Sequence, residues 1–514
     1  MLKPRFDFVS FLLLVSVIFF STPLLIFVFG WLRLIPAIIL FFLYLMVFVK
    51  YFRKENFTKN PAILSDSTET KFGIKFGNFE QVPVVFDLVF VLLLAFTLTY
   101  LSGVGGYAVQ AGDWLKHTAI FNDLINIPWP VVYNSGNGLA EGQEFILVYY
   151  LGHYLPASLV AKFFPNYALA LTYAIFVWTF LGISAGLFWF SHLTGCRVIW
   201  SSIFILFIGG LDIVGYYLIQ GKIYQFGDYL EWWAKIHMQY SSFTSIWFWV
   251  PQHSLALLIG VPALIFSLKL RRFSAASLLC ASLPLYSPFI VLGVLPFTLF
   301  FIFKSRPVFN ELKLEMALLV IFLCLYVSYL GATSGSLGLH FTHIAWSYNF
   351  LKAFFLFHIL EYGIYILIIG LARPWKFLQE TEFVWKYLYL LVLLVLFFIP
   401  FIRSQVWNDW TMRVSLPALY LTWVFLLRSF KILFVERRFV LAAISVIVFS
   451  FGALSGLPDW HRAFSTVGIR PNNYWGAVSI VTMDNLPVRA QYLSSGNNNI
   501  LNLIFRYNLL NKDN

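Results

Sequence analysis

Four residues with side chains suited to acid–base chemistry follow an early apolar segment of the chain: Asp113, Lys116, His117 and Asp123. Positions three and four apart share one face of a helix, so a helix here would place the first three side chains together. A carboxylate held by a cation and an imidazole can act as a general base or bind a divalent ion. The spacing predicts a catalytic or metal-binding group of Asp113, Lys116 and His117, in which Asp113 is a general base or a ligand of a divalent ion. The alternative is a solvated helix whose charges pair only with one another.

A second candidate region begins at Asp212, which ends a GGLD motif near one end of an apolar segment. An ionisable group at that depth is costly unless it faces a cavity or a partner, although the headgroup boundary would also accommodate it. The loop 220–253 that follows is rich in Trp and Tyr and ends with Trp249, Gln252 and His253. Aromatic rings stack on the apolar faces of sugars, whose hydroxyl groups need polar partners. These three residues are therefore predicted to bind a sugar or an acceptor, and an interfacial aromatic belt is the alternative.

A third candidate region holds Arg403 and Arg413 beside two tryptophans. A guanidinium forks onto phosphate oxygens, so a pair of them at headgroup level suits the phosphate of an anionic lipid. Snorkelling of a long cationic side chain is the alternative for Arg403. Basic residues are usually enriched on the cytoplasmic side, so an Arg413 on the outer side is unexpected. This exception favours a functional role for Arg413.

One pair of polar residues lies inside an apolar segment. His358 and Glu361 are three residues apart, so a helix would place them on one face. We expect them to pair structurally, and a proton relay is the alternative.

The elements that must position these residues are membrane-spanning helices. Hydrophobic residues make up 60% of the 514 and charged residues only 11%, so a water-facing globule could not cover the apolar surface. Apolar windows of about 20 residues, the length of a span, recur from Val9 to Leu457. The predicted fold class is all-α: a polytopic transmembrane bundle of about eleven to thirteen helices with a long, partly helical first outer loop.

The distribution of Lys and Arg sets the expected orientation. The net charge is +12, but most basic residues form short clusters between apolar segments, which is the positive-inside pattern and excludes a nucleic-acid partner. A transmembrane domain is therefore expected over 1–457, with the loops 103–166 and 220–253 on the outer side. A short outer-face segment, 458–514, is expected to cap these loops.

Two segments do not fit a simple alternation of crossings. The segment 145–164 is more polar than a span and is predicted to form an interfacial helix. The segment 275–303 has basic residues at both ends, so it must enter and leave on one side. We expect it to form two short helices that meet near Ser287-Pro288.

The sequence contains no nucleotide-binding loop, HExxH motif or cysteine-based metal pattern, which excludes most classes of soluble enzyme. Its layout resembles the multi-spanning GT-C glycosyltransferases, which have a long first outer loop with an acidic motif after an early span, and aromatic and basic outer loops. The resemblance covers much of the chain as architecture but only the first outer loop as motif. There the class often has two closely spaced acids, whereas this sequence has Asp113 alone.

The resemblance implies transfer of a sugar from a polyprenyl-phosphate-linked donor to a glycan, lipid or protein acceptor on the outer face of the membrane. It implies that Asp113 is the base or orients the acceptor, and that Asp123 or Asp212 supplies a second carboxylate in acceptor or sugar binding. Arg413 and Arg403 would hold the donor phosphate. A divalent metal ion stays open as a cofactor, since one carboxylate makes a poor metal site. The expected location is the bacterial cytoplasmic membrane, with the site facing outward.

Two other functions share these features. A transporter or flippase for a lipid-linked sugar or amphiphile also needs aromatic rings and cations, but it should place polar groups along a path through the bilayer midplane. This chain concentrates them at one face. A glycan polymerase or ligase acting on lipid carriers would share the transferase site, and the sequence does not separate the two.

Overall fold

A computed structural model gives the fold of the chain. It describes residues 8–55, 85–108, 110, 112–134, 144–225, 230–305, 307, 309–333, 339–342, 347–377, 382–404, 408–465, 479–482, 490–495 and 505–506. The structure is 80% helical. Eleven helices in these ranges are long and apolar enough to cross a membrane. The prediction of an all-α polytopic bundle is confirmed.

The bundle consists of long apolar helices and of helices that continue one another across a short break. In chain order these are α1 (Phe8–Trp31), α2 (Leu34–Lys50), α7 (Tyr167–Thr194), α8 (Val198–Phe207) with α9 (Asp212–Gln220), α11 (Pro251–Leu255) with α12 (Val261–Lys269), α14 (Pro288–Ser305), α15 (Lys313–Leu330), α16 (Tyr348–His358) with η8 (Ile359–Gly363) and α17 (Ile364–Ala372), α18 (Glu382–Phe398), α19 (Leu416–Val435), and α20 (Phe439–Ala453) with η13 (Leu454–Gly456) and α21 (Leu457–Ser465). Shorter helices are α4 (Val85–Leu101), α5 (Trp114–Asn126), α6 (Leu155–Lys162), α10 (Phe243–Trp249) and α13 (Phe273–Ser282).

Two small antiparallel sheets join loops that are distant in sequence. One contains β1 (Val132–Tyr133), β2 (Phe145–Leu147) and β5 (Leu493–Ser495), and the other pairs β3 (Leu339–Phe341) with β4 (Ile402–Ser404). In the first sheet Ile146 is opposite Ser494, so the C-terminal segment is bonded to the first long loop.

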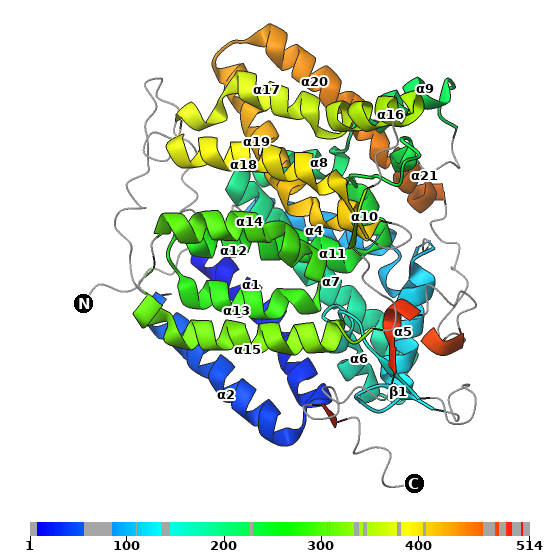
Figure 1. Cartoon of the computed structure of the whole chain (residues 1–514), viewed down its shortest axis with the longest axis vertical. Coiled ribbons are helices and arrows are strands. Elements are labelled where there is room, and N and C mark those ends of the chain that lie inside the picture. The colour runs from blue at the N-terminus through cyan, green and yellow to red at the C-terminus, as the bar shows by residue number, and fades with distance from the viewer. Residues whose placement is uncertain are drawn as a thin grey trace.

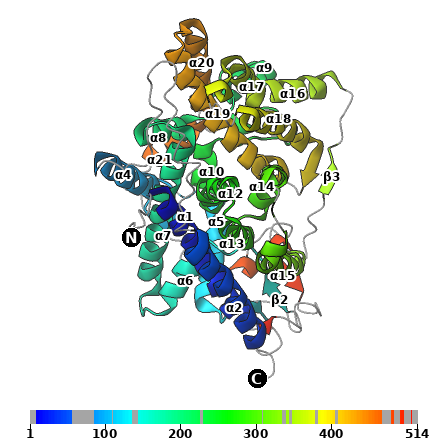
Figure 2. The same ribbon diagram turned by 90° about the vertical axis from the view of Figure 1, so that its left-hand side faces the viewer.

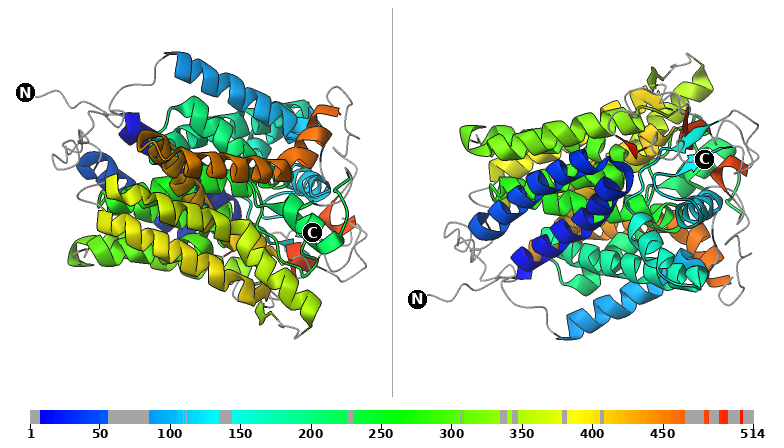
Figure 3. Two further views of the ribbon diagram at one scale, coloured as in Figure 1. Left: turned by 90° about the horizontal axis from the view of Figure 1, so that it is seen from above. Right: turned by 90° about the horizontal axis from the view of Figure 1, so that it is seen from below.

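The long helices lie side by side, and many of the short elements gather at one end of them. In Figure 1, α12 to α15 run across the picture, and α5, α6, β1 and α21 lie toward their right-hand ends. In Figure 2, α12 lies near the middle, while α2 and α20 lie at opposite margins. The burial of these helices agrees with a central α12 and a peripheral α2 and α20. In the span Pro251–Lys269, which contains α12, 94% of the apolar window is buried, against 28% for the windows that include α2 and α20. Figure 3 shows α5 at the same end in both views. This end is called the α5 end below.

The break between α8 and α9 is held by two neighbouring helices. Leu211 N–H donates to the Leu360 carbonyl of η8 at 3.0 Å. The hydroxyl of Ser455 in η13 donates to the Gly210 carbonyl at 2.7 Å. Backbone groups in an apolar surrounding must find partners within the protein. Three interrupted helices therefore meet here and bond to one another.

The predictions for segments 145–164 and 275–303, neither of which fits a simple alternation of membrane crossings, differ in how far the structure agrees with them. Segment 145–164 contains β2 and α6, and α6 has eight residues, which is too short for a crossing. That it does not span is confirmed, and its location at the interface stays a prediction. Segment 275–303 is divided between α13 and α14 near Ser287-Pro288, as predicted. However, α14 has 18 residues and is long enough to span, so the expectation of two short helices is wrong for it. Pro288 begins this helix, where a missing N–H costs nothing.

Gly152 lets the irregular stretch before α6 pack closely against the turn before α14. Its N–H donates to the Leu285 carbonyl oxygen at 2.6 Å. A Cβ atom at this position would lie 2.9 Å from that oxygen and 2.5 Å from Cδ2 of Tyr286. The backbone carbonyl cannot move aside without breaking the contact, so only glycine fits.

We expect Gly152→Ala to lower the free energy of unfolding by about 1–3 kcal/mol, because the added methyl group overpacks the contact. Denaturant unfolding of the purified protein in detergent measures the change. Gly112→Ala is the matched control, since its Cβ would lie 3.9 Å from Cζ3 of Trp249, an ordinary van der Waals contact. Equal stability of the two variants would contradict the close packing at Gly152.

Candidate functional site

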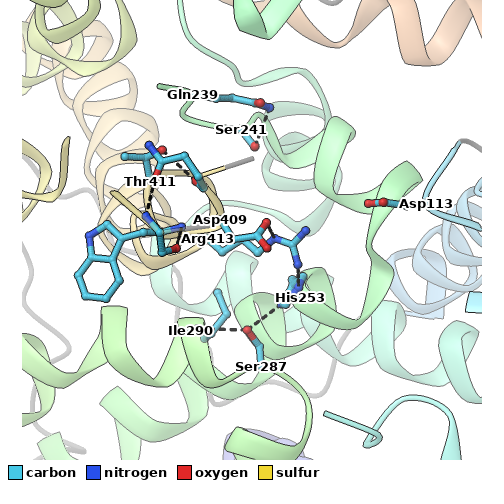
Figure 4. A network of polar contacts seen from close by, with 12 residues as sticks. Asp113, Gln239, Ser241, His253, Ser287, Ile290, Asp409, Thr411 and Arg413 are labelled. Atoms are coloured by element: carbon cyan, nitrogen blue, oxygen red, sulfur yellow. Dashed lines mark hydrogen bonds and ion pairs between the residues drawn. The ribbon is translucent and has the colours of Figure 1, made fainter. Parts of the chain in front are cut away.

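Arg413 belongs to a polar network at the α5 end (Figure 4). It lies in η12 (Trp410–Val414), a π turn at the start of the span that continues as α19. π turns are frequent at functional sites because they redirect side chains within a helix. Just before the turn, Asn408 has a φ of 54° in the left-handed region, and its side chain donates to the His237 carbonyl at 2.6 Å. This anchored bend sets the direction of Asp409 and of the turn that follows.

The guanidinium of Arg413 is held through two of its three nitrogens. Nε lies 3.0 Å from Oδ1 of Asp409. Nη1 donates to the Tyr150 hydroxyl at 3.1 Å and to Nε2 of His253 at 2.5 Å. In the part of the chain that the structure describes, no hydrogen bond or ion pair involves Nη2. Arg413 is thus a fixed, largely buried cation with one edge available.

His253 is a neutral imidazole with a defined tautomer. An arginine can only donate, so Nε2 of His253 must accept from Arg413. The proton is then on Nδ1, which donates to the Ser287 hydroxyl oxygen at 2.7 Å. Ser287 also accepts from the N–H of Ile290 in the first turn of α14, at 3.1 Å. His253 therefore positions Arg413 and connects it to the break between α13 and α14.

Asp113 lies just before α5 and points toward the Arg413 network (Figure 4). Its Oδ1 lies 3.0 Å from Nζ of Lys116, as the helical spacing predicts. Burial raises the pKa of the Asp113 carboxyl, but the charges of Lys116, Arg413 and their neighbours outweigh burial, so the pKa lies below its usual range. The side chain is 32% exposed. Asp113 is therefore an ionised carboxylate that is paired with Lys116, feels the charge of Arg413 and is partly exposed.

His117 is buried and bonded through both ring nitrogens. Nε2 lies 3.1 Å from the Trp249 carbonyl oxygen, which can only accept, so Nε2 carries the proton. Nδ1 then accepts from the Tyr154 hydroxyl at 2.5 Å. Burial, helped by Lys116, lowers the pKa of His117 to about 3. The predicted catalytic role for His117 is therefore better described as positioning, because neither nitrogen is available to a substrate.

A group of buried tyrosines surrounds Arg413, and the sequence did not single it out as a site. Tyr149 and Tyr150 stack with ring centroids 3.8 Å apart, and Tyr492 from the C-terminal segment lies 5.0 Å from Tyr149. Burial raises the pKa of Tyr150 to about 12 even though Arg413 lowers it, so the hydroxyl stays protonated. The available signal was the YYLGHY stretch, which gathers three Tyr and one His within six residues.

Two other predicted site residues are placed away from this network. The buried carboxylate of Asp123 accepts from the Tyr133 hydroxyl at 2.6 Å and from Ile480 N–H at 2.9 Å. It therefore joins α5 to the C-terminal segment. Arg403 lies on β4, where its backbone pairs with β3. Within the described residues no hydrogen bond or ion pair joins its guanidinium to Arg413 or Asp113.

Asp212 forms a second acidic group with Glu361 instead of joining Asp113. Asp212 is fully buried, and its Oδ2 and Oε2 of Glu361 both lie beside Gly210. Neither oxygen of Asp212 nor Oε2 of Glu361 makes a hydrogen bond to a described residue, whereas Trp233 Nε1 donates to Glu361 Oε1 at 2.7 Å. The expected His358–Glu361 pair is wrong. His358 bonds to the Tyr362 hydroxyl at 2.7 Å, because the π turn that follows rotates Glu361 toward α9.

Trp249 and Gln252, the two remaining residues predicted to bind a sugar, differ in whether their polar groups have partners. Trp249 donates from Nε1 to Oδ1 of Asp459 at 3.0 Å, and the guanidinium of Arg462 lies 5.1 Å from its ring centre. Its ring is thus already occupied on one side. Gln252 is fully buried, and neither atom of its amide group has a hydrogen-bond partner among the described residues. The amide donors and acceptor of Gln252 are therefore unpaired within the described residues.

Searches against protein-family models, curated proteins and solved structures find no match. Among the described residues, no group of three or more His, Cys, Asp and Glu side chains is placed to hold a metal ion. What the site can do is therefore inferred from its own geometry: a fixed cation, an ionised carboxylate and polar groups beside a bundle of apolar helices.

We expect Asp123→Asn to lower the free energy of unfolding by about 1–2 kcal/mol, because both hydrogen bonds go to one carboxylate oxygen and a neutral amide oxygen is a weaker acceptor. Tyr133→Phe, which removes one donor, should have a smaller effect. Unfolding in detergent measures both variants. A fully stable Asp123→Asn variant would contradict the structural role of this carboxylate.

Proposed function

We propose that the protein is a membrane glycosyltransferase that moves a sugar from a polyprenyl-phosphate-linked donor to an acceptor hydroxyl. The observation that supports it is the convergence of an ionised carboxylate, Asp113, and a fixed guanidinium, Arg413, at one end of an apolar bundle. The lipid chain of such a donor needs an apolar surface, and its phosphate needs a cation. The acceptor hydroxyl needs a group that takes its proton.

Arg413 is suited to hold the donor phosphate. Asp409, His253 and Tyr150 fix its orientation, and Nη2 remains for a phosphate oxygen. A hydrogen-bond donor that is already oriented stabilises the charge that develops on the phosphate without having to reorganise. During transfer the bond between the anomeric carbon and the phosphate oxygen breaks. The phosphate leaves with an additional negative charge, which Arg413 and Lys116 stabilise.

Asp113 is suited to accept the acceptor's proton. As the acceptor oxygen bonds to the anomeric carbon, its proton passes to the Asp113 carboxylate. The lowered pKa keeps Asp113 ionised but makes it a weak base in the empty site. A phosphate that attracts Lys116 removes one counter-charge from Asp113 and raises its pKa. Donor binding would thus prepare the base for the acceptor.

The remaining groups suit recognition of the sugar and the acceptor. Gln252 offers an amide without a partner, and the tyrosines around Arg413 offer hydroxyl groups and ring faces. The proposal places the α5 end on the outer side of the bacterial cytoplasmic membrane. The acceptor is a glycan, lipid or protein, and Asp113 would be the carboxylate to hold a divalent ion, which would help to neutralise the leaving phosphate. A glycan polymerase or ligase would use the same groups.

Asp113→Asn should lower turnover about 10²–10⁴-fold, because the amide cannot take a proton. The measurement is transfer of labelled sugar from a synthetic polyprenyl-phosphate donor by the reconstituted protein. Asp123→Asn is the control, since it makes the same substitution farther along, within α5 and away from Arg413. Wild-type turnover in Asp113→Asn would contradict the role of this carboxylate as base.

Arg413→Lys should weaken donor binding at least about tenfold, because the three N–H groups of one ammonium nitrogen cannot bond to Asp409, Tyr150 and His253 and also to the phosphate. Equilibrium binding of the donor lipid in detergent micelles measures the loss. The matched control is Arg403→Lys, whose parent side chain lies outside this network. Equal losses in both variants would place the phosphate elsewhere.

A second candidate function is proton- or cation-coupled transport of a lipid-linked sugar, and the Asp212–Glu361 group favours it. Both carboxyl groups lie in interrupted candidate spans, where transporters place coupling sites. We expect this function, if present, to appear as a pH change in the lumen of proteoliposomes when the donor lipid is added. Glu361→Gln should abolish the signal, and an unchanged signal would contradict coupling through this group.

A further inference from the structure

A single hydroxyl group, that of Ser245, joins α21 to the segment 230–253. This segment is rich in Trp and Tyr and is called the aromatic loop below. Oγ of Ser245 in α10 lies 2.7 Å from Oε1 of Glu231 and 2.8 Å from Oδ2 of Asp459 in α21. All three residues are at most 9% exposed. The segments that carry Glu231 and Asp459 are therefore held together through Ser245.

The number of hydrogens at this contact requires a protonated carboxyl group. The Ser245 hydroxyl has one hydrogen and can donate it to only one of the two carboxyl groups. The Ser242 hydroxyl also donates to Ser245 Oγ, at 3.2 Å, and so adds no hydrogen between Ser245 and either carboxyl group. Two ionised carboxylates on one buried hydroxyl would repel each other with one contact unfilled. One of them must therefore donate to Ser245.

The surroundings identify Glu231 as the protonated group. Asp459 accepts from Trp249 Nε1 at 3.0 Å and pairs with Arg462, and both interactions favour its ionised form. Glu231 faces no cation among the described contacts. It accepts from Gln239 Nε2 at 2.6 Å and from Ser242 N–H at 3.0 Å, which leaves one oxygen position to donate to Ser245.

We propose that Glu231, Ser245 and Asp459 form a proton-binding latch that fastens α21 to the aromatic loop when Glu231 is protonated. The proton on Glu231 bonds to Ser245, and the Ser245 hydrogen bonds to Asp459. Loss of the proton leaves Ser245 between two negative charges and weakens the attachment of α21. This latch is separate from the transferase proposal and does not depend on it.

The charges around Glu231 favour the bound proton. Asp212 in α9 and Glu361 in η8 act on it from one side, and Asp459 and its partner Arg462 in α21 lie across Ser245. Burial, and then the charge of Asp212, raise the pKa of Glu231 to about 8. An acid whose pKa is raised by folding stabilises the folded arrangement while it is protonated. The latch is therefore closed at neutral pH and opens as the pH rises through about 8.

The latch reaches the candidate site through Trp249. The indole of Trp249 is held by Asp459, and its carbonyl oxygen accepts from His117, the residue that follows Lys116. Opening of the latch frees Asp459 from Ser245 and so weakens the anchor for the Trp249 indole. A proton bound at Glu231 thus influences the position of the helix that carries Asp113 and Lys116.

Hydrogen–deuterium exchange of the full-length protein in detergent tests the latch. We expect the protection factor of Leu457–Ser465, corrected for the intrinsic pH dependence of exchange, to fall about tenfold between about pH 7 and about pH 9. In Glu231→Gln the side-chain amide donates to Ser245 but does not titrate, so protection should stay high at both pH values. Glu436→Gln changes an exposed carboxyl group at the far end of α19 and should behave as wild type.

Ser245→Ala gives a second test that does not require the Glu231 variant to fold. Without the hydroxyl, protection of Leu457–Ser465 should be low at both pH values. The proposal is overturned if wild-type protection does not change with pH. It is equally overturned if either Glu231→Gln or Ser245→Ala shows the wild-type pH dependence.

Discussion

The charge of Arg413 constrains the arrangement of the whole α5 end. A guanidinium among apolar helices costs several kcal/mol unless its N–H groups are bonded and its charge is paired. Its partners are Asp409 in the preceding residues, His253 in α11 and Tyr150 before α6. These lie far apart in sequence, so burial of one cation fixes three segments relative to one another.

Because His253 is neutral, Arg413 can bond to it although a second cation, Lys116, lies nearby. His253 can accept from Arg413 only without a proton on Nε2, and Ser287 secures that tautomer by accepting from Nδ1. Ser287 also bonds to the first turn of α14. The π turn at Arg413 and the break between α13 and α14 therefore belong to one hydrogen-bonded structure. Both irregularities interrupt apolar helices where polar side chains must be accommodated.

The sequence was sufficient to predict the spans, because each of them is a local property of about 20 residues. Side-chain type alone also predicted Asp113, Lys116, His253 and Arg413 as site residues, and the structure places these four near one another. It could not show that Asp123 and Asp212 have other partners, since those partners lie up to hundreds of residues away.

Two kinds of error have identifiable physical causes. Glu361 was expected to pair with His358, but a π turn changes the helical phase by which i and i+3 positions share a face. Tyr150 was assigned to an interfacial helix, whereas it lies in an irregular stretch that the close contact at Gly152 holds against the bundle. Neither feature has a periodic pattern in the sequence, so only tertiary contacts reveal them.

The charges in the candidate site balance before any ligand binds. Arg413 pairs with Asp409, Lys116 pairs with Asp113, and His117 is neutral because its pKa is about 3. An incoming phosphate must therefore share a cation with a carboxylate. Arg413 is held by three partners, whereas the flexible stem of Lys116 allows its ammonium group to move. For the proposed transfer, Lys116 is thus the cation that shifts, and Asp113 rather than Asp409 is the carboxylate that becomes more basic.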